Sequence, residues 1–80
     1  MHDELIREIE DWVPVLQGEL DRQTPLITSG RIDSLGLFRL VMWIERKLGR
    51  PINVAGIEMA KELDSIDAIV GFVIRERERR

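Results

Sequence analysis

The chain contains no cysteine and only one histidine among its 80 residues. Without cysteine it can form no disulfide and offers no thiolate of its own. A single histidine, with no Asp/Glu cluster at calcium-loop spacing, gives no recognisable metal site. No apolar run approaches the roughly 20 residues that span a bilayer, and the N-terminal sequence lacks the pattern of a secretory signal. We therefore expect a cytoplasmic protein with no metal and no membrane span.

The chain also has no excess of basic residues. Its formal net charge is −3, divided into −4 on residues 1–40 and +1 on residues 41–80. Nucleic-acid binding usually needs a clear basic patch, so no nucleic-acid partner is expected. Residues 75–80 alternate Arg and Glu and end in two arginines, a pattern typical of a solvated helix end. Eighty residues make one domain that is too small for a roomy catalytic cleft.

Helical periodicity dominates, and no strand-like alternation persists anywhere. Acidic residues indicate the N-terminus of the first helix, and a proline indicates where that helix ends. Glycine ends the second helix, and cations occupy its last turn. The sequence therefore predicts an all-α fold, a small four-helix bundle of three main helices and a short third one. In chain order, the expected helices are Asp3–Trp12, Ser34–Leu48, Ala55–Glu62 and a last helix that Asp64 or Ser65 caps.

A long connection, residues 14–33, separates the first two helices. Loops of this length are uncommon in compact domains unless they are functional or held by apolar side chains of their own. We expect it to wrap the core. The apolar residues that could hold it are Val15, Leu16, Leu20, Leu26 and Ile27.

The second helix has apolar residues on two faces. Leu35, Phe38 and Met42 lie together on one face, bordered by Arg39 and Arg46. Such a stripe beside arginines predicts a partner-binding surface with a positively charged rim. The alternatives are that the long connection, or a second copy of the chain, covers it. The other face, which suffices for the core, comprises Leu37, Leu40, Val41, Ile44 and Leu48, with Trp43 partly buried beside it.

Ser34 stands where the long connection ends and the second helix begins, directly after Asp33. The unpaired N–H groups and dipole of a helix N-terminus favour a phosphate there, and Asp33 is placed to cap the helix. A serine hydrolase would need a general base, and the one histidine, His2, is expected in a mobile N-terminus. The residues therefore indicate that the protein is the substrate of a modifying enzyme and is not itself an enzyme. A hydrolase using Ser34 and His2 is the alternative.

Two segments then carry a family resemblance. Residues 24–37 read Thr-Pro-Leu-Ile-Thr-Ser-Gly-Arg-Ile-Asp-Ser-Leu-Gly-Leu, and residues 62–73 read Glu-Leu-Asp-Ser-Ile-Asp-Ala-Ile-Val-Gly-Phe-Val. The first is similar to the attachment segment of the phosphopantetheine-dependent carrier proteins, and the second is similar to the entry to their last helix. The chain thus resembles an acyl or peptidyl (aminoacyl) carrier protein of the discrete type, over residues 1–80 as a single domain.

The resemblance implies that Ser34 is esterified to 4′-phosphopantetheine, taken from coenzyme A by a phosphopantetheinyl transferase. The terminal thiol of this arm would hold an acyl or aminoacyl group as a thioester. Asp33 would cap the helix and help to present Ser34 to the transferase. By the same resemblance, Leu35, Phe38 and Met42 fall at positions that contact partner enzymes.

The sequence departs from the family pattern in two places. Carriers of fatty-acid synthesis usually have a strongly acidic second helix, whereas here that helix has a net charge of +2. This favours a monomeric carrier loaded by a dedicated adenylate-forming acyl or aminoacyl ligase, with a downstream acyl-accepting enzyme as the next partner. A fatty-acid or polyketide synthase carrier is the alternative, and a helical interaction module without prosthetic group is an alternative of another class. Residues 54–61 also depart from the usual acidic entry to the third helix.

Overall fold

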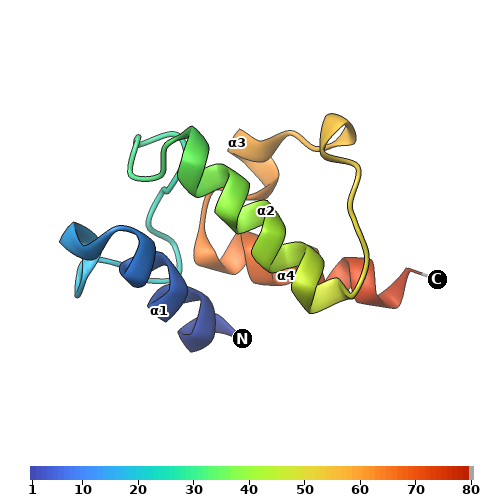
Figure 1. Cartoon of the computed structure of the whole chain (residues 1–80), viewed down its shortest axis with the longest axis horizontal. Coiled ribbons are helices and arrows are strands. Elements are labelled where there is room, and N and C mark those ends of the chain that lie inside the picture. Colours follow the sequence, from blue (N-terminus) through green and yellow to red (C-terminus); the bar gives the residue numbers. More distant parts are fainter. Residues whose placement is uncertain (80) are drawn as a thin grey trace.

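The computed structural model describes residues 1–79, which fold as a bundle of helices with no strand in that range. Helix α4 packs against α1, α2 and the short α3 (Figure 1). The fold is thus the all-α four-helix bundle that the sequence predicts. The elements, in chain order, are α1 (His2–Trp12), the 3-10 turn η1 (Pro14–Leu16), α2 (Ser34–Leu48), the 3-10 turn η2 (Val54–Gly56), α3 (Met59–Glu62) and α4 (Ile66–Glu78).

Local signals set the ends of α2. Asp33 precedes it with extended backbone and caps it through its side chain, as described below. Gly49 ends it in the left-handed region, with φ of 73°, and donates its N–H to the Glu45 carbonyl at 2.8 Å. Glycine takes this conformation without steric cost. Both ends of α2 therefore lie at the residues that the sequence predicts.

The third helix is shorter than predicted. Of the expected range 55–62, only Met59–Glu62 is α-helical, and Val54–Gly56 forms a separate 3-10 turn. The Asn53 side chain accepts from the Ala55 N–H at 3.2 Å and fixes this single turn. Glycine in a helix interior costs about 1 kcal/mol relative to alanine, so Gly56 does not support a continuous helix.

The core lies between α1, α2 and α4. The residues of α2 that are buried in it differ in part from those that the periodicity predicts. Trp43 is 1% exposed, so the expectation of partial burial was wrong. The Glu4 carboxylate on α1 pairs with Lys47, one turn beyond Trp43, so α1 covers this side of α2. Trp43 Nε1 is buried without a hydrogen-bond partner in the described part of the chain. Of the predicted stripe, Leu40 and Ile44 are fully buried, whereas Leu37, Val41 and Leu48 are half-buried.

The long connection is held to the bundle by buried side chains and by backbone hydrogen bonds. Leu16, Leu26 and Ile32 are buried, whereas Val15, expected to hold the loop, is 80% exposed at the η1 turn. The Leu26 N–H donates to the Asp64 carbonyl at 2.7 Å.

The Asp64 carboxylate accepts three hydrogen bonds from this connection. Oδ1 accepts from the N–H groups of Ile27 at 2.7 Å and Thr28 at 2.9 Å, and Oδ2 accepts from the Thr28 hydroxyl at 2.7 Å. Partial burial raises the pKa of the Asp64 carboxyl, but the hydrogen bonds from Thr28 and Ile27 outweigh it and hold the pKa below its ordinary value. Ser65, not Asp64, caps α4, because Ser65 Oγ accepts from the Ala68 N–H at 3.1 Å.

Replacing Asp64 by alanine removes every acceptor that its side chain offers to this loop. Hydrogen bonds to charged groups contribute more than neutral ones, so Asp64→Ala is expected to lower the free energy of unfolding by about 2 kcal/mol. Urea denaturation followed by circular dichroism measures it. Asp11→Ala, at an exposed position on α1, serves as the control and should change stability by less than about 0.5 kcal/mol. Equal stability of the two variants would contradict this role for Asp64.

The pKa of Asp64 also predicts a pH dependence. The folded state binds this proton more weakly than the unfolded chain, whose aspartate pKa is 3.8. The stabilisation is therefore complete above that value and is lost as the pH falls through it toward the folded pKa. Between about pH 5 and about pH 3, stability should fall more steeply in the wild type than in Asp64→Asn, which cannot titrate. Parallel pH profiles of the two proteins would rule out this contribution.

Candidate functional site

Ser34 is the first residue of α2, and its side chain is exposed. The side chain of the preceding residue, Asp33, accepts from the Gly36 N–H at 2.9 Å through Oδ1 and so caps the helix. The N–H groups of Ser34 and Leu35, in the same first turn, have no carbonyl partner within the helix. They and the helix dipole produce a positive potential beside the Ser34 hydroxyl. The predicted cap is thus present.

The loop before Ser34 fits closely against the start of α2. The Ile32 N–H donates to the Leu26 carbonyl at 2.9 Å, and the Ile32 side chain is buried. A Cβ added at Gly36 would lie 2.7 Å from Ile32 Cγ2, closer than two carbon atoms pack. The Ile32 side chain therefore packs directly against the backbone at Gly36, and a larger residue there would require Ile32 to shift.

Ser34 differs from the other hydroxyl side chains in its hydrogen bonding. Thr24 Oγ1 donates to Asp21, Thr28 Oγ1 to Asp64, and Ser29 Oγ to the Pro25 carbonyl. Ser65 caps α4. Within residues 1–79 the Ser34 hydroxyl has no such structural role, so it is free to react.

The structure does not bring His2 to Ser34. His2 lies in α1, not in a mobile N-terminus, and its Nε2 is 2.9 Å from Asp67 Oδ1. Glu4, two residues later, pairs with Lys47, which lies about 20 Å along α2 from Ser34. His2 is thus engaged by Asp67 and not by Ser34, so the contacts give no support to a hydrolase that uses Ser34 and His2. Within residues 1–79 there is also no group of side chains that could hold a metal ion.

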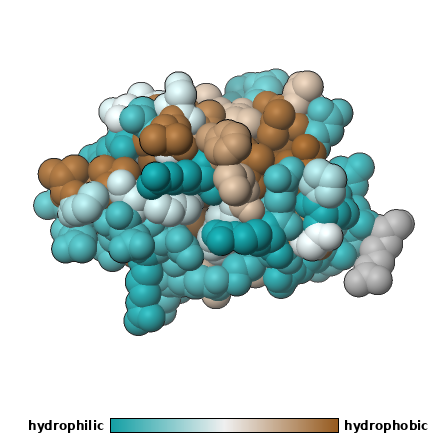
Figure 2. Space-filling view, in the orientation of Figure 1, coloured by the Kyte–Doolittle hydropathy of each residue, from teal (hydrophilic) through white to brown (hydrophobic). Residues whose placement is uncertain are grey.

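The second apolar stripe of α2 is on the surface. Leu35, Phe38 and Met42 are 61%, 59% and 49% exposed, and Arg39 and Arg46 are exposed as well. Figure 2 shows apolar surface over α2 interrupted by hydrophilic side chains, with further apolar surface toward η2. The long connection does not cover these residues, which excludes one of the two alternatives. We call Leu35, Phe38, Arg39, Met42 and Arg46 the α2 face.

The candidate site is thus an exposed serine at the capped N-terminus of α2 in a small helical bundle. A family described as "Phosphopantetheine attachment site" matches residues 3–73, most of the chain. The protein therefore belongs to this family, the acyl and peptidyl carrier proteins, whose members carry covalent 4′-phosphopantetheine and are not enzymes. No curated protein and no solved structure gives a significant match.

The start of α2 fits this prosthetic group. Its phosphodiester is an anion, and the uncapped N–H groups of the first turn favour an anion beside Ser34. Both Ser34 and Leu35 are exposed, so this end of the helix is open to solvent. None of the helices in the described range is long and apolar enough to cross a membrane.

The cap predicts a graded response to substitution at Asp33. Asp33→Ala should lower the free energy of unfolding by about 1 kcal/mol, whereas Asp33→Ser keeps a capping oxygen and should lose much less. Thermal unfolding by circular dichroism measures both. If the two variants are equally unstable, the hydrogen bond to the Gly36 N–H does not stabilise the helix.

Proposed function

We propose that Ser34 is the residue that receives 4′-phosphopantetheine, and that the protein carries an acyl or aminoacyl group as a thioester between partner enzymes. The observation that supports this most directly is the exposed Ser34 hydroxyl, which is free of structural hydrogen bonds at the capped start of α2. Family membership supports the prosthetic group, and the position of Ser34 within the matched range is compatible with attachment there.

In this proposal the chain contributes a nucleophile and its setting. Ser34 Oγ forms the phosphodiester with the pantetheine phosphate of coenzyme A, and the nucleoside bisphosphate leaves. The serine proton goes to a base on the transferase. Asp33 holds the first turn of α2 in place and so presents Ser34 to the transferase. When bound, the arm supplies the thiol that the cysteine-free chain lacks.

The α2 face is the proposed docking surface for these partners. Its apolar residues can enter a groove, and its two arginines favour a groove with an acidic rim. Three bases and one acid on α2 give it a net charge of +2. A partner with a basic docking patch, as fatty-acid carriers meet, would be repelled. This supports loading by a dedicated adenylate-forming acyl or aminoacyl ligase and transfer to a downstream acyl-accepting enzyme.

We also infer that residues 1–80 act as one monomeric carrier domain. The matched range begins in α1 and ends in α4, so it takes in all the packed helices. The alternative of an interaction module without prosthetic group has no support of this kind.

Intact-protein mass spectrometry tests the attachment site. After incubation with coenzyme A and a broad-specificity phosphopantetheinyl transferase, the wild type should gain one phosphopantetheine, and Ser34→Ala should gain none. Ser29→Ala, at another exposed serine of the preceding loop, is the matched control and should gain one. Modification of Ser34→Ala, or no modification of the folded wild type, would refute the proposal.

Charge reversal tests the docking surface. In Arg39→Glu/Arg46→Glu, loading by a ligase that acts on the wild type should fall about tenfold or more at low salt and recover partly at high salt, because salt screens exposed charges. Arg7→Glu, on α1, is the control and should load normally. Undiminished loading of the double variant at low salt would exclude this docking model and leave the Ser34 assignment intact.

A further inference from the structure

The last turns of α2 and α4 meet in a surface concavity of about 500 Å³. We call this concavity the basic end. It lies at the C-terminal end of α2, about 20 Å along the helix from Ser34. The residues that line it are Lys47, Leu48, Arg50, Glu76, Arg77 and Arg79.

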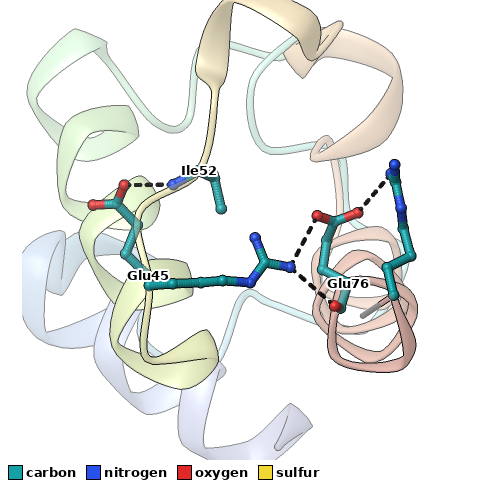
Figure 3. Close-up of polar contacts among 5 residues, drawn as sticks. Glu45, Ile52 and Glu76 are labelled. Atoms are coloured by element: carbon teal, nitrogen blue, oxygen red, sulfur yellow. Dashed lines mark hydrogen bonds and ion pairs between the residues drawn. The ribbon is translucent and has the colours of Figure 1, made fainter.

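Two arginines of the basic end tie the helix ends together. Arg50 Nη2 donates to the Glu76 carbonyl of α4 at 3.0 Å, and Arg77 Nη2 donates to the Lys47 carbonyl of α2 at 3.2 Å. The Glu76 carboxylate lies between Arg50, at 3.4 Å, and Arg79, at 3.2 Å (Figure 3). Arg50 and Arg77 thus connect the two helix ends and offset the negative ends of the two helix dipoles, while the side chains of Arg77 and Arg79 remain exposed, as predicted for a solvated helix end.

The guanidinium groups retain unused hydrogen-bond donors. Each has five N–H donors, and the contacts above use one nitrogen of each group. Lys47 is paired with Glu4, so the charge of the lining is that of three arginines against Glu76. Glu78, beside the adjoining concavity, offsets one more charge and leaves the surface net positive.

We propose that the basic end is a second docking surface, which binds a carboxylate-bearing segment of a partner protein. Positioned guanidinium groups bind carboxylates through paired hydrogen bonds. Because the surface is concave, a projecting segment of a protein can reach its arginines more easily than a flat anionic bilayer can. The inference rests on the proposed function, in which the partner acts on an arm at Ser34. A second contact about 20 Å from Ser34 would fix the direction of α2 on that partner and leave the arm unobstructed.

Nuclear magnetic resonance of the ¹⁵N-labelled apo protein tests this surface, with acetylated hexaglutamate amide as the probe. At low ionic strength the peptide should shift the backbone amides of residues 47–50 and 76–79. Arg50→Gln and Arg79→Gln should each raise the Kd about fivefold. Arg79 is highly exposed, and among residues 1–79 its ion pair is with Glu76, so its variant should fold normally. Arg7→Gln, on α1, is the matched control and should leave the Kd unchanged.

Three results would overturn the inference. These are no shifts at all, shifts confined to residues 35–46, and a Kd that neither arginine variant changes. Vesicles of equimolar phosphatidylcholine and phosphatidylserine form a second arm. Sedimentation of the protein with vesicles, while the peptide produces no shift, would assign the surface to a bilayer and refute a protein partner. Phosphopantetheine transfer is read separately by mass, so failure of the proposed function is distinguishable from failure here.

Discussion

The Asp64 carboxylate is the contact on which the geometry around Ser34 depends. It joins Ile27 and Thr28 to the start of α4 across 37 and 36 residues of sequence. Residues 17–33 include no helix, so their backbone N–H groups need partners from elsewhere or from water. Asp64 supplies acceptors for three of them, two through its carboxylate and one through its carbonyl, and thereby holds the loop several residues before Asp33. The position of Ser34 is therefore set from α4 as well as from α2.

The parts of the fold that sequence analysis predicts are those with local causes. The limits of α2 follow from a capping aspartate and a terminal glycine, which act within one turn. The exposure of the stripe from Leu35 to Met42 follows from helical periodicity. The Asp64 contacts could not be predicted in this way, because nothing near Asp64 in the sequence indicates a partner so distant. The burial of Trp43 likewise depends on where α1 packs, which periodicity within α2 does not specify. The exposure of Val15 depends on the path of a loop whose turns the sequence signals only weakly.

Charge is distributed unequally over the bundle. Helix α1 has five acidic residues and one basic residue, whereas α2 has three basic residues and one acidic residue. The ion pair between Glu4 and Lys47 joins the two helices at the end remote from Ser34. The molecule is consequently acidic in total and yet presents a basic helix beside its candidate attachment site. Long-range attraction to a partner is governed by this local distribution as well as by the net charge of −3.

The close fit between Ile32 and Gly36 has a consequence for motion. A helix start that leaves no space for a methyl group at Gly36 allows little independent movement of the loop that leads into Ser34. Exposed side chains and flexible chains reorient in picoseconds to nanoseconds, whereas packed elements rearrange far more slowly. The start of α2 is therefore a packed element, whereas the exposed side chain of Ser34 itself is free to reorient.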